Sequence, residues 1–403
     1  MAAIQFTTTL DFLIIMPLGP QYMRVFAITP GQFGLMVSAY AISAGISGVA
    51  AGCFLDRFDR KTALLGLYLG FAVGTLFCAL APTYHLLVAA RILAGAFGGV
   101  AGSLILAIIG DVVPIERRGA AMGMVMSSFS VASICGVPLG VVLATHLSWH
   151  VPFYALAGLS VLILLAAATI MPSLRAHLEH AYDARPIARV WAIVAPPNHR
   201  LAFVFMALLT SAGFFMFPYI PAYMVANAGM TEKQLPLIYL FGGVCTLVSM
   251  NSIGRWADRA GKRRVFTLVS LSVAVPILIL TNLPRVPIAA ALAVTCLLWI
   301  CMSGRMVPAM AMMTATVEAR QRGGFMSINA AVQQFSSGLA AFIGGQILGQ
   351  APSGEMTHFP IIGVISVTCV YTCIYLARFL THRAPAAPDD KASSGEAVMA
   401  AAE

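Results

Sequence analysis

Charged residues are scarce in this 403-residue chain: Asp, Glu, Lys and Arg make up 10% of it, against roughly 25% in soluble domains. Hydrophobic residues make up 60%. This composition excludes an ordinary soluble domain, and apolar runs of about 20 residues, each long enough to cross a bilayer, recur along the chain. We expect the spans to be helices, because a backbone in lipid must satisfy its own hydrogen bonds.

The chain also lacks clusters of metal ligands or nucleophiles. Its 8 cysteines lie inside apolar runs without metal-ligand spacing, and its 8 histidines lie near loops or helix ends. We therefore expect no metal, no cofactor and no catalytic residues. The N-terminus has neither the basic segment nor the cleavage site of a signal peptide, so we interpret the first apolar run as a span.

The net charge of +9 is sorted by side rather than gathered into one patch. If the N-terminus is cytoplasmic, nearly all Lys and Arg residues outside the apolar runs fall on the cytoplasmic side, and the outer loops hold only Arg24, Lys233 and Arg285. This positive-inside distribution predicts a multi-pass protein of a bacterial-type inner (plasma) membrane with both termini cytoplasmic. It favours the lipid bilayer, and not nucleic acid, as the partner.

A charged signature occurs twice, once between Gly52 and Lys61 and again between Gly254 and Arg264. Its aspartates, Asp56 and Asp258, are 202 residues apart, and an Arg-Gly pair further along recurs with an offset of 204. Repetition at half the chain length indicates two similar halves.

These observations predict an all-α membrane protein with twelve transmembrane helices in two pseudo-symmetric six-helix bundles. The composition turns abruptly polar between 172 and 199 and again after 383. The predicted divisions are an N-terminal bundle over 1–171, a cytoplasmic linker over 172–199, a C-terminal bundle over 200–383 and a disordered cytoplasmic tail over 384–403.

Six plus six helices, a charged central linker and the repeated signature resemble the major facilitator superfamily of secondary transporters, over essentially residues 4–383. The resemblance is closest to the drug/proton antiporter branch. It implies that the signature forms a cytoplasmic gate, in which Asp56 meets the start of the helix near Gly323. The first copy departs from the family pattern at Asp59, where glycine is preferred. The residues assigned to the gate, with one acid at the end of the fourth helix added, are Gly52, Asp56, Arg57, Arg60, Asp111, Gly254, Asp258 and Arg259.

Two further family motifs are matched in part, one in the fourth helix and one in the fifth. Small residues there permit close helix contact and a proline permits a bend, so plain helix packing and a coupling role both stand as interpretations. The residues of these motifs are Arg91, Gly95, Gly136, Pro138 and Gly140. Because Arg91 lies near the outer end of its helix, we expect it to snorkel.

An ionisable side chain deep in a membrane is a functional hypothesis by default. Asp11 is the only acid well away from a predicted helix end, and we expect it to take and release a proton as its exposure alternates; the alternative is a permanently paired structural carboxylate. Counted from the cytoplasmic helix ends, Arg305 has a similar depth, and we predict that it pairs with Asp11. Two alternatives are that Arg305 binds an anionic substrate or snorkels to the cytoplasmic surface.

Other polar residues at interior depth are candidates for the substrate cavity. Besides Arg305, they are Tyr40, Asn251, Asn329 and Gln333. Asn329 and Gln333 are four residues apart and share a helix face.

The predicted function is proton-driven export of small, partly hydrophobic organic molecules by alternating access, with the proton gradient as the driving force. The alternative is a proton-coupled importer or facilitator of a sugar, organic anion or other metabolite. We expect protons and a small-molecule substrate as the partners and a monomer as the working unit. An enzyme would need clustered reactive groups at interior depth, and a channel fits an internal repeat less well.

Overall fold

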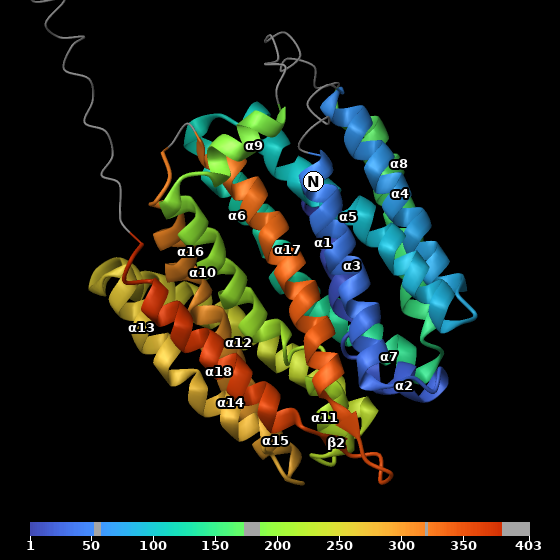
Figure 1. The fold of residues 1–403 in the computed structure, drawn as a ribbon. Helices are drawn as coiled ribbons and strands as arrows, with labels where there is room; N and C mark the ends of the chain where they lie inside the picture. Colours follow the sequence, from blue (N-terminus) through green and yellow to red (C-terminus); the bar gives the residue numbers. More distant parts are fainter. Residues whose placement is uncertain (52–57, 173–185, 319–320, 381–403) are drawn as a thin grey trace, which may run out of the picture.

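The computed structural model describes residues 1–51, 58–172, 186–318 and 321–380. These residues are helical almost throughout, and the helices run roughly side by side in two groups (Figure 1). The glycine, aspartate and arginine of the first signature that were assigned to the gate, Gly52, Asp56 and Arg57, lie outside the described residues, as does the predicted tail over 384–403.

The first half begins at the N-terminus and ends at Ile170. Its helices are α1 (Ala2–Ile14), α2 (Gly19–Val25), α3 (Pro30–Ala51), α4 (Arg60–Leu80), α5 (Tyr84–Val112), α6 (Ile115–Val131), a π-helical turn η2 (Ala132–Gly136), α7 (Val137–His146) and α8 (His150–Ile170). The short helix α9 (Pro186–Val194) falls within the predicted linker.

The second half repeats this order and adds one small hairpin, in which strand β1 (Gly349–Gln350) pairs antiparallel with β2 (Met356–Thr357). Its helices are α10 (Pro197–Phe214), α11 (Ile220–Ala226), a 3-10 turn η4 (Glu232–Gln234), α12 (Leu235–Ala260), α13 (Lys262–Ser272), α14 (Ala274–Thr281), α15 (Ile288–Gly304), α16 (Met306–Thr314), α17 (Arg322–Ile347) and α18 (Phe359–Leu376).

Nine helices of the described chain are long and apolar enough to span a membrane, and the bent pair α1 and α2 makes ten. Two further spans were expected at 201–226 and 324–349. Both segments are helical, as α10 with α11 and as α17, but they are less apolar than the other spans. The helical fold in two halves is therefore confirmed, and the number twelve stays a prediction.

Proline accounts for the breaks that interrupt several of these helices, because it supplies no backbone N–H to the turn before it. Pro20 stands at the start of α2, which is bent by 55° from α1. Pro221 stands at the start of α11, and Pro138 opens α7 directly after the π turn. The first helix of each half is thus divided at the same place.

The hydrophobic core shows which end of the bundle is closed. We call the end with the N-terminus and α9 the terminal end, and the end with α2, α11 and β2 the distal end (Figure 1). Towards the distal end one cluster of buried side chains joins both halves, from Phe33 and Phe153 to Tyr219 and Phe359. Towards the terminal end each half has a separate cluster, around Phe71 in one and Phe266 in the other. Among the described residues the two halves therefore share a core towards the distal end, while towards the terminal end each half has a core of its own.

Glycines bring the helices of the two halves together at the distal end. A Cβ added at Gly34 of α3 would lie 2.8 Å from the carbonyl oxygen of Ala341 in α17 and would collide with the hydroxyl of Tyr219. The Arg24 guanidinium, near the end of α2, also pairs with the Glu232 carboxylate across the two halves. Towards the terminal end, a Cβ at Gly48 of the same helix α3 would meet nothing within 4 Å.

The two copies of the charged signature turn differently. In the second copy Gly261 has φ +91° between α12 and α13, a conformation that only glycine adopts readily. The matching residue of the first copy, Asp59, has φ −54° and caps α4 by accepting hydrogen bonds from Lys61 N at 3.4 Å and Thr62 Oγ1 at 3.0 Å. A helix cap thus stands where the other half has a glycine turn.

Candidate functional site

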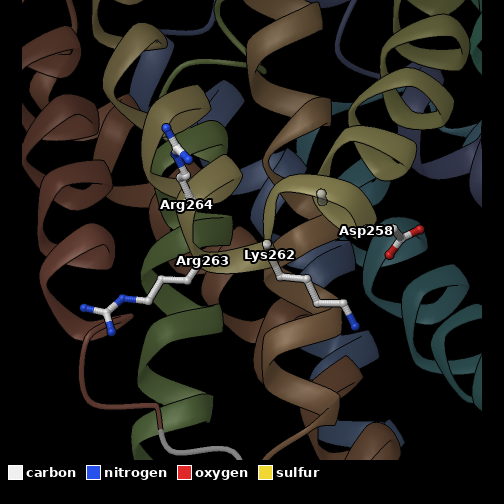
Figure 2. A pocket seen from close by; sticks show the side chains of 6 residues that line it. Asp258, Lys262, Arg263 and Arg264 are labelled. Carbon is white, nitrogen blue, oxygen red and sulfur yellow. The ribbon is translucent and has the colours of Figure 1, made fainter.

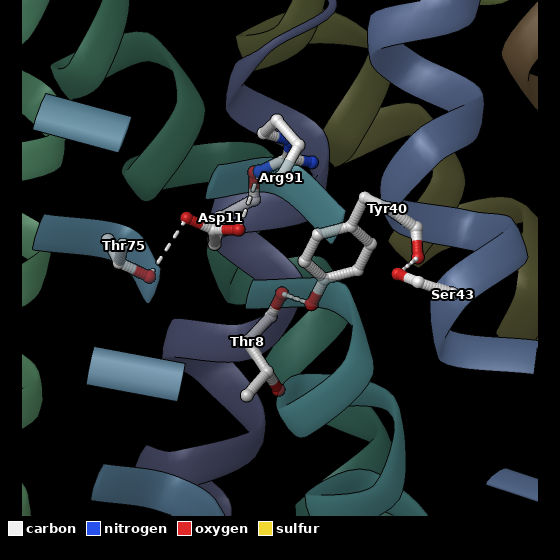
Figure 3. Close-up of polar contacts among 6 residues, drawn as sticks. All are labelled: Thr8, Asp11, Tyr40, Ser43, Thr75 and Arg91. Carbon is white, nitrogen blue, oxygen red and sulfur yellow. Dashed lines mark hydrogen bonds and ion pairs between the residues drawn. The ribbon is translucent and has the colours of Figure 1, made fainter. Parts of the chain in front are cut away.

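The centre of the first half contains a fully buried ion pair. Asp11 of α1 is 0% exposed, and its Oδ2 accepts a hydrogen bond from Arg91 Nη1 at 2.7 Å. The same Nη1 donates to the Asp11 carbonyl oxygen at 3.1 Å, and Thr75 Oγ1 of α4 donates to Asp11 Oδ1 at 3.2 Å (Figure 3). Three helices therefore hold one carboxylate, away from water.

An aromatic ring covers the other side of this ion pair. The Arg91 guanidinium carbon lies 4.4 Å from the centre of the Tyr40 ring, a cation–π contact. The Tyr40 hydroxyl donates to the carbonyl oxygen of Thr8 at 3.4 Å (Figure 3). Gly95 of α5 lies directly against the Tyr40 backbone. Glycine at 95 is what lets α5 approach α3 closely enough for this arrangement.

Arg91 is the partner of Asp11, so the prediction that Arg305 pairs with Asp11 is wrong for this structure. The expectation that Arg91 snorkels is also wrong, because its side chain is 0% exposed. Asp11 lies within the unbroken helix α1, before the break that follows Ile14. A residue count gives depth along one helix but does not say which helices are neighbours, and α1 packs against α5, which carries Arg91. The Pro17–Pro20 segment was the signal in the sequence for that break.

Arg305 lies in the second half, at the break between α15 and α16, and is 2% exposed. Its Nη2 donates to the carbonyl oxygen of Leu209 at 3.2 Å and lies 3.0 Å from Met302 Sδ. No acid pairs with it within the described residues. Burial also argues against snorkelling, since the side chain does not reach a surface.

The internal repeat shows that the fold does not require the ion pair. Pro20 and Pro221 open equivalent short helices with an offset of 201 residues, which places Ala212 where the first half has Asp11. Helices α5 and α15 start 204 residues apart, so Thr295 is the residue of the second half that is equivalent to Arg91. Thr295 donates to carbonyl oxygens of its own helix. One half thus folds with an apolar and a neutral residue at the positions that carry charge in the other.

Aromatic rings continue from the ion pair into the second half. Phe12 lies 5.5 Å from Tyr40 and 5.8 Å from Phe214 of α10, measured between ring centroids. Phe217 follows at 6.0 Å from Phe214 and stacks on Trp299 of α15 at 5.1 Å. The sequence did not single out Phe12 or Trp299, because aromatic residues on helices usually serve packing. Only the tertiary structure brings these rings into one continuous series.

The other polar cavity candidates are separate from the ion pair in their described contacts. Asn251 is exposed and donates to Leu247 of its own helix. Asn329 is 1% exposed, and its Oδ1 has no hydrogen-bond partner among the described residues. Gln333 is half-buried. No described contact brings these three side chains together.

The second signature lines a surface pocket of about 410 Å³ at the turn between α12 and α13 (Figure 2). Asp258 and Arg259 are exposed, and Lys262 and Arg263 extend in opposite directions from the turn. Gly254 lies beside Val307 of α16. In the first copy of the signature, Arg60 is among the described residues and is buried. The side chain of Asp111, the gate candidate at the end of α5, is outside the described part of the structure.

The fifth-helix motif packs against the first helix. A Cβ at Gly136 would lie 2.8 Å from a methyl of Leu10, and Gly140 lies directly against Ile14. Leu10 directly precedes Asp11, and Ile14 is the last residue of α1 before the helix break, so both contacts are close to the ion pair or to the break. These glycines therefore fix where α1 lies relative to the π turn and α7.

The sequence model of the Major Facilitator Superfamily matches residues 1–299 and 252–401. An uncharacterized MFS-type transporter of Bacillus subtilis, YceJ, is 27% identical over 66% of this chain and 68% of its own length. The inner membrane transport protein YdhP of Escherichia coli is 25% identical over 85% and 86%, and the chloramphenicol resistance protein of Streptomyces lividans is 25% identical over 60% and 61%.

Solved structures share the fold at low sequence identity. The nucleoside transporter NupG superposes with a TM-score of 0.73 at 12% identity, over 94% of this chain and 98% of the NupG chain. A bacterial homologue of the human lysosomal transporter Spinster, in an inward-facing and occupied conformation, has a TM-score of 0.69 at 14% identity over 94% of both chains. These similarities support the fold alone.

Proposed function

Because this chain belongs to the major facilitator superfamily and is a membrane transporter, not an enzyme, we propose that it exports small organic molecules in exchange for protons and that Asp11 carries the proton. The observation that supports this proposal most directly is the buried Asp11–Arg91 pair, which one half has and the other lacks. A buried charged pair that the second half folds without, at a depth where charge is costly, is by default a functional hypothesis.

The exchange follows from the chemistry of the pair. When Asp11 is ionised, the Arg91 guanidinium satisfies it and holds α5 to α1. A proton on Asp11 removes the negative charge, and Arg91 then stands buried and unpaired at a cost of about 3–5 kcal/mol. That cost is large enough to change which of two conformations is favoured.

The state of the two ends of the bundle is the one expected of an exporter before it binds substrate. In the proposed orientation the terminal end faces the cytoplasm, as the positive-inside distribution favours, and the protein lies in an inner membrane. The structure combines a closed distal end with an intact ion pair. An exporter that has released its proton inwards and is ready for substrate from the cytoplasm has this combination of features. A proton-coupled importer after release has it too, so transport in vesicles of known orientation decides the direction.

Everted membrane vesicles test the proposal, because their cytoplasmic face is outside. With the interior made acidic, wild-type protein should accumulate a small organic probe, for which chloramphenicol is a reasoned first choice given one relative's name. Asp11→Asn should lose accumulation but keep exchange of labelled for unlabelled probe, since only the proton-carrying step is removed.

The matched control is Glu355→Gln, at an exposed acid in the hairpin between β1 and β2, remote from the ion pair. It should retain coupling to the pH gradient. Accumulation in right-side-out vesicles with an acidic exterior would contradict export and support a proton-coupled importer. Accumulation by Asp11→Asn equal to that of wild type would contradict the assignment of the proton to Asp11. We propose a monomer as the working unit.

A further inference from the structure

Phe12 and Phe214 form a ring contact between the two halves beside the ion pair. Their centroids are 5.8 Å apart and their planes are inclined by 37°. Phe12 belongs to α1 and Phe214 to α10, the first helix of each half, and each lies just before the break in its helix. Rocking of the two halves therefore changes the gap between these two rings directly.

Both rings are partly exposed, as are Phe217 and Trp299, whereas Tyr40 is packed more deeply. Tyr40 is 2% exposed, and Phe12 and Phe214 are half-buried. Each of the two rings has a fixed aromatic neighbour on its own side: Tyr40 for Phe12 and Phe217 for Phe214. The two halves thus face each other through two aromatic rings, Phe12 and Phe214, that are each partly exposed.

The charges around these rings favour an uncharged ligand. The carboxylate of Asp11 is already occupied by Arg91 and Thr75, so a cationic ligand has no free acid there. The other acids whose side chains are described lie at helix ends or in loops. Arg305, the buried cation without an acid partner among the described residues, donates to Leu209 and is 2% exposed, so an anionic ligand cannot reach it in this state.

One buried donor is available further along the series of rings. The indole Nε1 of Trp299 has no hydrogen-bond partner among the described residues, although its surface is buried. Trp299 stacks on Phe217, the neighbour of Phe214. Nε1 lies beside Gly242 of α12 and is buried in this state, as Arg305 is. A ligand with an oxygen or nitrogen acceptor gains the hydrogen bond that the protein alone does not make when the Trp299 side chain turns towards it.

We propose that the substrates are flat, uncharged aromatic molecules with a hydrogen-bond acceptor, and that the substrate ring inserts between Phe12 and Phe214. This inference rests on the proposed function and names its substrate class. When the ring is bound, it replaces the contact between the two phenylalanines with two stacked contacts, one to each half. The substrate then connects the halves through Phe12 and Phe214 and so couples its own binding to their relative position.

The test compares one flat ligand with its saturated counterpart. Naphthalen-2-ylmethanol and decahydronaphthalen-2-ylmethanol share a hydroxyl acceptor and a carbon skeleton but differ in planarity and aromaticity. Binding to the purified full-length protein in detergent is measured by titrated thermal shift. Wild type should bind the naphthalene compound at least tenfold more tightly, and Phe214→Leu and Phe12→Leu should each reduce its affinity about three- to tenfold, as expected for one lost aromatic contact.

Two further variants separate a binding role from a structural one. Phe214→Tyr retains the ring and should retain the affinity, which also controls for variants that fold poorly. Phe379→Leu removes an exposed ring that contacts Tyr375 at the end of the second half, and its affinity should equal that of wild type. Equal binding of the two ligands, unchanged affinity in both leucine variants, or tighter binding of the flat cation ethidium would each overturn the inference.

The outcomes also distinguish this inference from the proposed function. Proton-driven export that is lost in Asp11→Asn but unaffected by Phe12→Leu and Phe214→Leu, for aromatic and saturated probes alike, would overturn the ring site and leave proton antiport standing. Selective naphthalene binding that requires both phenylalanines, without any transport driven by a proton gradient, would support the ring site and contradict the antiport.

Discussion

Arg91 Nη1 bonds both the side chain and the main chain of Asp11, at 2.7 Å to Oδ2 and 3.1 Å to the carbonyl oxygen. The side-chain bond depends on the charge of Asp11, while the main-chain bond does not. Protonation of Asp11 therefore weakens one attachment between α5 and α1 and leaves the other in place. The pair can change its strength without releasing the helices altogether.

The first prediction concerns which arginine governs the response to pH. Arg91→Met should abolish the dependence of transport on pH, because the partner of the Asp11 carboxylate is removed. Arg305→Met should leave that dependence unchanged, since Arg305 contacts Leu209 and Met302 instead. Transport rates in vesicles between pH 5 and 8 check this, with reduced rates expected for either variant but a flattened profile only for Arg91→Met.

The second prediction concerns stability of the ion pair. Asp11→Asn should lower the free energy of unfolding by about 3–5 kcal/mol, because it leaves the buried Arg91 cation unpaired. The double variant Asp11→Ala with Arg91→Thr, which copies the residues Ala212 and Thr295 of the second half, should recover much of that loss while remaining uncoupled. Thermal unfolding of the purified variants measures the first effect and vesicle transport the second; a double variant no more stable than Asp11→Asn would contradict it.

The third prediction uses two glycines of one helix, α3. Gly34→Ala should favour opening of the distal end, since the new Cβ would lie 2.8 Å from Ala341 O and would strike Tyr219. Gly48→Ala is the matched control, because its Cβ meets nothing within 4 Å. Cysteine pairs placed across the distal end should cross-link more slowly in Gly34→Ala than in wild type. Equal rates in Gly34→Ala and Gly48→Ala would show that the glycine contact does not hold this end closed.

The fourth prediction concerns the ion pair between the ends of the halves, Arg24 and Glu232. The Arg24 side chain is 65% exposed, so the pair should contribute at most about 1 kcal/mol and Glu232→Gln should change transport only a few-fold. Arg24→Cys with Glu232→Cys, joined by a bis-methanethiosulfonate cross-linker that spans the length of the two original side chains, should stop transport until a reductant is added. Full transport by the cross-linked double variant would contradict closure and reopening at this site.

The fifth prediction compares the two signature turns. Gly261→Ala should destabilise the protein by about 1–3 kcal/mol, because φ +91° is strained for alanine. Asp59→Ala should cost about 1 kcal/mol through the lost cap on α4. Gly66→Ala, within α4 and without neighbours at 4 Å, is the control and should be neutral or stabilising. Thermal unfolding measures all three, and a Gly261→Ala variant as stable as wild type would contradict the turn geometry.

The membrane environment, the helical secondary structure and the internal repeat could all be predicted from the sequence. Apolar runs in a chain with 10% charge can be satisfied only as helices in a membrane, and Asp11 was singled out because an acid far from a helix end is costly there. Helix bounds followed from runs, prolines and caps, all of which act over a few residues. These features are local, so no knowledge of the packing was needed.

Which side chains pair with each other could be learned only from the tertiary structure. Asp11 meets Arg91 rather than Arg305 because α5 packs against α1 and Gly95 lets α5 approach α3, and both effects depend on how helices pack in space. The contact of Phe12 with Phe214 joins residues about half the chain apart, and nothing in either local sequence selects the other. Depth counted along a sequence assumes straight helices, whereas the pairing of side chains depends on the breaks and close approaches that the packing creates.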